Sequence, residues 1–228
     1  MRVAVLVFPG SNCDQDAYHA IKNILGAEAE FVWHREKTLS GFDAVIIPGG
    51  FSYGDYLRSG AIARFAPIMA AVKKLADAGA PIMGICNGFQ ILVEAGMLPG
   101  ALISNASLRF VSRMVALRPE HTDSPFTSAL DSSASYAMPV AHQSGNFAVS
   151  PDQLAAMEEH GQIAFRYVDA RGKTTAKANP NGSTGHIAGV LNKRRNVLGL
   201  MPHPERAVEA LMGSADGLEL FKSMMGAA

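Results

Sequence analysis

The sequence predicts an α/β fold: a doubly wound, mostly parallel sheet flanked by helices, with a more antiparallel C-terminal part. In the first half, short and continuous apolar runs alternate with segments of helical composition, as in parallel strands covered on both faces. From Phe110 onward the apolar runs alternate with polar residues and are separated by polar turns. Because no repeat, low-complexity tract or linker interrupts the chain, we expect residues 1–228 to form one domain.

The first half contains the signals of a parallel sheet. Strands are predicted where apolar runs end at turn residues, at Val3 to Phe8, Ala29 to Trp33, Ala44 to Ile47 and Pro81 to Ile85. Helices are predicted between and after these strands, at Asp14 to Leu25, Ile62 to Ala78 and Asn87 to Ala95. Each of these helices is followed by a glycine, which is typical of a helix C-terminus.

The second half contains more strands than helices. Strands are predicted at Phe110 to Leu117, Tyr136 to Val140, Ile163 to Val168, Ile187 to Leu191 and Val197 to Met201. Ser150, Pro151 and Gln153 form a helix start, because serine suits the N-cap, proline the first helical position and glutamine a capping box. This helix should end near Gly161, and Asp169 to Ser183 should be a polar loop.

Composition limits the kinds of partner. Twenty basic and twenty acidic residues give a formal net charge of zero, so there is no reason to expect nucleic acid or an anionic membrane surface as a partner. The sequence has no apolar run of membrane-spanning length and no signal-peptide pattern at its N-terminus. We therefore expect a cytoplasmic protein, in which the two cysteines, Cys13 and Cys86, stay reduced.

Cys86 stands where a nucleophile would stand. The predicted strand Pro81 to Ile85 leads into Gly84-Ile85-Cys86-Asn87-Gly88, which repeats the spacing of the Gly-x-Ser-x-Gly elbow of hydrolases. Cys86 would then lie at a helix N-terminus, where the helix dipole favours the thiolate and the N–H of Asn87 can bind an oxyanion. The alternative is that Cys86 is a small buried apolar residue, as most free cysteines are.

A base for this thiol is predicted near the C-terminus. His203 follows the last apolar run, and Glu205 lies two residues further on, so in an extended segment both side chains project to the same side. Glu205 could then orient His203 while His203 takes the thiol proton. His142 competes as a base, but no carboxylate follows it within two residues.

Together these segments resemble the class I (triad) glutamine amidotransferases. The resemblance rests on Gly84 to Gln90 and on Pro202-His203-Pro204-Glu205. Three further blocks resemble the glutaminase subunits of phosphoribosylformylglycinamidine synthases, at Phe8 to Asp14, Gly50 to Ala61 and Asn179 to Ser183. Gln143 and Ser144 depart from the His-Gly-Glu-Gly pattern of those subunits.

The resemblance implies a catalytic triad of Cys86, His203 and Glu205 that hydrolyses glutamine to glutamate and ammonia through a thioester. It also implies a second oxyanion turn after Pro48, so the oxyanion hole is predicted to comprise Gly50, Phe51 and Asn87. Candidates for binding the glutamine substrate are Gln90, Arg109 and Phe110. We expect no metal site in this chain.

The resemblance further implies partners. The chain has no Gly-x-x-x-x-Gly-Lys-Ser/Thr loop, so ATP and Mg²⁺ are expected in a separate large synthetase subunit that makes formylglycinamidine ribonucleotide, with a small third subunit bridging the two. Three alternatives stay open: a glutaminase serving another synthase, a cysteine peptidase of the same topology, and a non-enzymatic interaction subunit.

Overall fold

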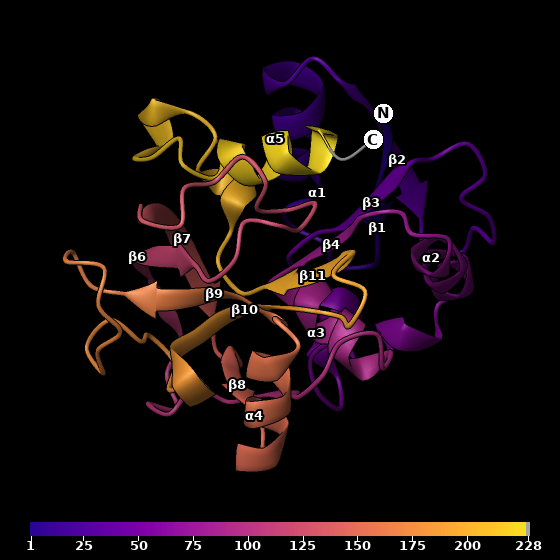
Figure 1. Ribbon diagram of the computed structural model, residues 1–228. Helices are drawn as coiled ribbons and strands as arrows, with labels where there is room; N and C mark the ends of the chain where they lie inside the picture. Colours follow the sequence, from indigo (N-terminus) through magenta and orange to yellow (C-terminus); the bar gives the residue numbers. More distant parts are fainter. Residues whose placement is uncertain (227–228) are drawn as a thin grey trace.

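A nine-stranded mixed sheet forms the centre of the protein (Figure 1), in a computed structural model that describes residues 1–226. The strand order is β2-β1-β3-β4-β11-β10-β9-β6-β7. The parallel half comprises β2 (Glu28–Trp33), β1 (Arg2–Val7), β3 (Ala44–Ile47), β4 (Ile82–Ile85) and β11 (Val197–Leu200). The antiparallel half comprises β10 (Ile187–Leu191), β9 (Ile163–Val168), β6 (Val111–Pro119) and β7 (Tyr136–His142). The predicted α/β fold is confirmed, and its two halves share one continuous sheet.

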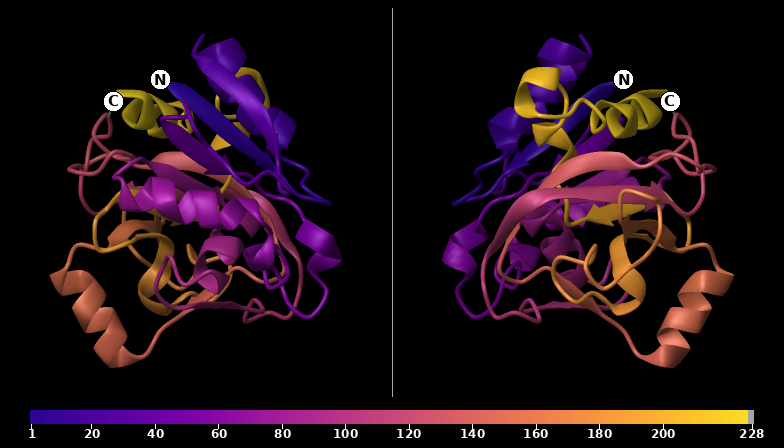
Figure 2. Two further views of the ribbon diagram at one scale, coloured as in Figure 1. Left: turned by 90° about the vertical axis from the view of Figure 1, so that its right-hand side faces the viewer. Right: turned by 90° about the vertical axis from the view of Figure 1, so that its left-hand side faces the viewer.

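Helices cover the central strands of the parallel half because these strands are apolar on both faces. Every residue of β3 and β4 is buried. Figure 1 shows α1 (Asp14–His19) and α5 (Leu218–Gly226) above the sheet and α3 (Asn87–Glu94) below it. α4 (Pro151–Glu159) projects from the body of the molecule (Figure 2) and begins with the predicted capping box. None of the helices in residues 1–226 has the length and apolar character needed to span a lipid bilayer.

The structure differs from the predicted elements at several places. The predicted helix Ile62 to Ala78 is divided into a 3₁₀ turn at Ala63–Phe65 and α2 (Ile68–Asp77). Ala66 between them is extended, with φ −62° and ψ 140°, because the ring of Pro67 disfavours a helical conformation at the preceding residue. α5 and the small second sheet of β5 (Ala101–Ile103) and β8 (Asn146–Ala148) were not among the predicted elements.

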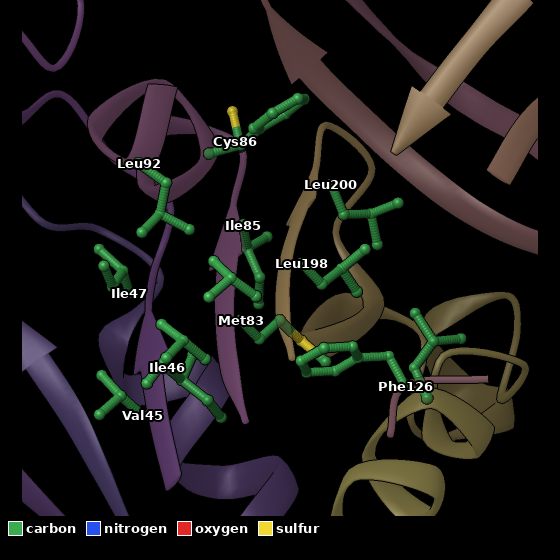
Figure 3. Packing of buried hydrophobic residues seen from close by; sticks show 14 of the residues in the cluster. Val45, Ile46, Ile47, Met83, Ile85, Cys86, Leu92, Phe126, Leu198 and Leu200 are labelled. Atoms are coloured by element: carbon green, nitrogen blue, oxygen red, sulfur yellow. The ribbon is translucent and has the colours of Figure 1, made fainter. Parts of the chain in front are cut away.

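The sheet brings the two predicted catalytic segments to one edge. β4 and β11 are parallel neighbours, with Ile85 paired to Leu200, so the residues that follow both strands leave the sheet at the same end. Figure 3 shows Cys86 at the end of β4, above a layer of apolar side chains that includes Ile85, Leu92 and Leu200. The buried core therefore fixes the place from which the Cys86 side chain projects.

The start of α3 packs closely against β3. A Cβ atom added to Gly88 would overlap the carbonyl of Ile47, and backbone cannot move as a flexible side chain can. We therefore expect Gly88→Ala to destabilise the protein by about 3 kcal/mol or more. Thermal unfolding should show a melting temperature lowered by roughly 6 °C or more for a protein of this size.

Gly226→Ala is the matched control, because Gly226 is also helical and a Cβ there would meet none of residues 1–226 within 4 Å. Its melting temperature should stay within about 1 °C of the unmodified protein, since surface substitutions rarely change stability by more than about 0.5 kcal/mol. Equal melting temperatures for the two variants would contradict the close approach of α3 to β3.

Candidate active site

Cys86 occupies a strained backbone conformation between β4 and α3. Its φ of 50° and ψ of −102° are rare for a residue with a side chain, and such strain is typical of functional positions. The Cys86 N–H donates to the Leu200 carbonyl at 2.7 Å, which fixes the turn against β11. The glycines on either side are needed because a Cβ at Gly84 would lie 2.5 Å from a methyl of Leu92.

His203 and Glu205 form a buried hydrogen-bonded pair beyond the end of β11. His203 Nδ1 lies 2.6 Å from Glu205 Oε1, and the two residues are only 2 % and 1 % exposed. Pro139 of β7 accepts the His203 N–H at 2.9 Å, which sets the position of the ring. The other ring nitrogen, Nε2, is buried and has no hydrogen-bond partner among residues 1–226, so it is available for proton transfer.

The charges around His203 favour its protonated form. Burial lowers the pKa of His203, but the negative charges of Glu205 and Cys86 oppose burial and together raise this pKa well above its usual range. The Glu205 carboxylate therefore acts on His203 both by orienting the ring and by stabilising the imidazolium.

A cleft of about 630 Å³ opens above Cys86, a volume suited to a small-molecule substrate. Several predicted site residues line this cleft, namely Gly50, Phe51, Cys86, Gln90 and Phe110. Its remaining walls come from the 55–59 segment, from β5 and from the end of β7 with the turn that follows. The cleft is therefore the place where a substrate can reach the thiol.

The three predicted oxyanion donors differ in whether their N–H groups already have a hydrogen-bond acceptor. The Phe51 N–H donates to the Gly10 carbonyl at 2.8 Å, so in this conformation it is not free to bind an oxyanion, and its role as a donor stays a prediction. The N–H groups of Gly50 and Asn87 have no acceptor among residues 1–226. For Asn87 the reason is its place in the first turn of α3. Gly50 has φ 149°, a conformation that favours glycine.

Of the three predicted substrate-binding residues, Gln90 and Phe110 line the cleft and Arg109 does not. Gln90 is buried, and its Nε2 donates to the Ser144 carbonyl at 2.7 Å, which joins α3 to the turn after β7. Phe110 lines the cleft and is half exposed. Arg109 is exposed and is not among the residues that line the cleft. Its carbonyl accepts from the Asn105 side chain at 2.9 Å, which holds this residue in a turn outside the cleft.

His142 lies in the cleft wall within a hydrogen-bond network that was not predicted from the sequence. Its Nδ1 lies 3.1 Å from Asn105 Oδ1, and its Nε2 lies 3.5 Å from the Asn181 amide nitrogen. Burial, reinforced by the charge of His203, lowers the pKa of His142 to about 4, so the ring is neutral at pH 7. Asn181 belongs to the Asn179 to Ser183 block, and its side chain also binds the Gly145 carbonyl at 2.7 Å. The hydrogen bonds of this block therefore stabilise the turn after β7.

The chain is similar to known glutamine amidotransferases over almost its whole length. Residues 1–222 match the family model of the CobB/CobQ-like glutamine amidotransferase domain. The phosphoribosylformylglycinamidine synthase subunit PurQ of Thermomicrobium roseum is 58% identical over 225 residues, which cover 99% of this chain and 95% of the relative. The subunit of the same name from Methanosarcina barkeri is 53% identical and is covered to 97%.

A solved structure supports the same relationship. A chain in the structure of PurLQS from Thermotoga maritima superposes with a TM-score of 0.88 at 44% identity, covering 99% of this chain and 98% of that chain. The fold, the cleft and the sequence thus agree, and the chain belongs to the class I glutamine amidotransferases, in the family with the CobB/CobQ-like glutamine amidotransferase domain.

Proposed function

We propose that this chain is the glutaminase subunit of a phosphoribosylformylglycinamidine synthase, a ligase of purine biosynthesis that uses glutamine as its nitrogen donor. The observation that carries the proposal is Cys86 on its strained elbow, at the same sheet edge as the buried His203–Glu205 pair and open to the cleft. The identity of more than half of all residues to PurQ subunits supports the choice of synthase.

The first half of the reaction forms a thioester. The Cys86 thiolate attacks the side-chain amide carbon of glutamine, and the carbonyl oxygen becomes an oxyanion near the N–H groups of Gly50 and Asn87. The His203 imidazolium then gives its proton to the amide nitrogen, the carbon–nitrogen bond breaks, and ammonia leaves. A glutamyl thioester on Cys86 remains.

The second half restores the enzyme. His203 Nε2, now neutral, takes a proton from water while that water attacks the thioester carbon. The carbon–sulfur bond breaks, glutamate is released, and Cys86 and His203 return to their starting state. Glu205 keeps its hydrogen bond to Nδ1 in both halves, so the ring keeps its orientation throughout.

The ammonia is used elsewhere in the complex. A large synthetase subunit would use ATP and Mg²⁺ to convert formylglycinamide ribonucleotide to its amidine, and a small subunit would bridge the two chains. Ammonia would pass internally, because in neutral water it is protonated and is then no nucleophile. This assignment would fail if the purified chain, with its co-purifying subunit, hydrolysed peptides in preference to free glutamine.

The loop of residues 52–58 contributes to the wall of the cleft and has features of a surface that binds a partner. Tyr53, Asp55 and Leu57 all have positive φ, which is uncommon outside glycine and marks a strained loop. Leu57 is 89% exposed. The loop is tied to the elbow, because the Asn87 side chain accepts the Ser52 N–H at 3.0 Å and donates to Asp55 at 3.3 Å.

We therefore expect the isolated chain to hydrolyse glutamine slowly and to be activated by the synthetase loaded with its substrate and nucleotide. Contact with the loop would release the Phe51 N–H from Gly10 and let it bind the oxyanion. Gain of one such donor is worth roughly 10²-fold or more in rate. Glutamine turnover measured for the chain alone and with saturating partner gives the ratio directly, and full activity in isolation would exclude this gate.

Arg58→Ala tests the part played by the loop. Arg58 and Arg2 both form bidentate ion pairs, Arg58 with Glu94 and Arg2 with Glu30. Arg2, however, lies at the N-terminal end of β1, whereas Cys86 follows the C-terminal end of the parallel strand β4. Arg58→Ala should reduce activation by the partner, while Arg2→Ala should leave it unchanged. Normal assembly and activation of the Arg58 variant would remove this loop from the mechanism.

A further inference from the structure

Cys13 lies beside the acid–base pair and has no part in the mechanism above. Its side chain is only 3% exposed. Its Sγ, a ring nitrogen of His203 and a carboxylate oxygen of Glu205 all lie within 4.8 Å of one another. Because the pair itself is joined by a 2.6 Å hydrogen bond, the cluster has the arrangement of a proton-transfer site with a thiol packed against it.

The backbone fixes the position of this thiol. The N–H groups of Asn12 and Cys13 donate to the Gly49 carbonyl at 3.1 and 3.2 Å, so the loop after β1 is attached to the oxyanion turn. A Cβ at Gly49 would stand 3.1 Å from Cys13 Sγ and 2.7 Å from His203 Cε1. The sulfur, the imidazole and the Gly49 backbone therefore meet at one closely packed point.

Within the described part of the chain, only one of the two carboxylate oxygens of Glu205 is hydrogen-bonded. Its Oε1 binds His203, but its Oε2 is buried and has no hydrogen-bond partner among residues 1–226. A buried charged oxygen without a partner is costly and calls for a functional explanation. The neighbouring Cys13 is a weak donor, and burial raises the pKa of its thiol, so the thiol stays neutral.

We propose that Cys13 is a positioning residue that acts on His203 through Glu205. Its soft, neutral sulfur fills the space beside the pair, keeps water from Oε2 and offers no strong hydrogen bond. The charge of the carboxylate is therefore directed at the His203 imidazolium and not shared with a second donor. The proposal rests on the proposed function in taking His203 as the base for Cys86.

Other groups near His203 do not account for such an effect. Cys86 faces the ring from the start of α3, and His142 approaches from β7 as a neutral imidazole. Arg206 lies near Cys13 and Glu205, but its charge is paired with Asp16 at 3.0 Å. None of these groups supplies a hydrogen bond to Glu205 Oε2. The Cys13 sulfur lies within 4.8 Å of a Glu205 carboxylate oxygen, so a stronger donor at position 13 is placed to bond this carboxylate.

The experiment compares Cys13→Ser, a strong donor, with Cys13→Val, an apolar side chain that offers no donor. The chain has two cysteines, so each variant keeps Cys86 as its only thiol. The alkylation rate of Cys86 by iodoacetamide is measured against pH, and in a thiolate–imidazolium pair the upper step of this profile reports loss of the His203 proton. Serine would bond Oε2 and weaken its support of the imidazolium, so the proton should leave at lower pH.

We expect the upper step to fall by about one pH unit in Cys13→Ser, the size expected for a hydrogen bond to a charged group, and to stay in place in Cys13→Val. Equal shifts in both variants would mean that packing matters and donor strength does not, which overturns the proposal. No shift in either variant would also overturn it. If the pH profile of the unmodified protein showed only the single step of an ordinary thiol, Cys86 would not be paired with His203. This result would contradict the assignment of His203 as the base and, with it, the proposed function. If Cys13→Val does not fold, Cys13→Ala takes its place under the same criteria.

Discussion

Cys86→Ser is expected to abolish glutamine-dependent synthesis of the amidine while ammonia-dependent synthesis by the assembled complex stays nearly intact. The loss should be on the order of 10⁴-fold or more, the scale for removing the nucleophile of a triad. The reason is that in the proposed mechanism Cys86 alone forms the covalent intermediate, while the ATP-dependent step is assigned to another chain. The measurement is product formation by the reconstituted complex, with glutamine or with ammonium salt as the nitrogen source.

The ammonia-dependent assay is also the control for folding and assembly of the Cys86 variant. A serine differs from the cysteine by one atom, so the elbow between β4 and α3 should keep its conformation. Equal loss of both activities would show that Cys86 supports the structure of the complex, or that this chain carries part of the synthetase chemistry.

The second large effect is expected at the acid–base pair, where His203→Ala and Glu205→Gln should differ. Loss of the base should cost on the order of 10⁴-fold or more, and loss of the orienting carboxylate should be less damaging by about 10- to 100-fold. Without the charge of Glu205, the pKa of His203 should fall, so less imidazolium is present at neutral pH to protonate the leaving amide nitrogen. Glutaminase turnover of the activated complex, measured for both variants, gives the two factors.

His142→Ala is the matched control for the base assignment. His142 is also a buried histidine in the site, but its ring is neutral at pH 7 and contacts the side chains of Asn105 and Asn181 instead of a carboxylate. We expect a much smaller loss of turnover than for His203→Ala. If correctly folded His142→Ala were as inactive as His203→Ala, the assignment of His203 as the base would be wrong.

Much of the fold could be predicted because its strands are continuous apolar runs with clear ends. β9 and β10 match their predicted bounds, and β4 and α3 differ from theirs by one residue at one end. The errors have local causes. Pro67 divides the predicted helix Ile62 to Ala78, and three-residue strands such as β5 are too short to show a periodic pattern.

The site was predictable where one residue type determines the chemistry. Cys86, His203 and Glu205 stand in short motifs, and these motifs predicted the elbow at Cys86 and the contact between His203 and Glu205, while the catalytic roles of the three residues stay predictions. Three other features depend on how distant segments pack together. These features are the hydrogen bond from Phe51 to Gly10, the buried Glu205 Oε2 without a partner among residues 1–226, and the hydrogen bond from Asn181 to Gly145. No local pattern encodes such contacts, so a single sequence could not reveal them.

The central claim is that glutamine hydrolysis passes through a thioester on Cys86. The most direct test is to quench the activated complex with acid during turnover of labelled glutamine and to locate the label by peptide mapping. We predict a glutamyl adduct on the peptide that contains Cys86, and no adduct in Cys86→Ser. Label on Cys13, or turnover at full rate without any covalent adduct on this chain, would contradict the account.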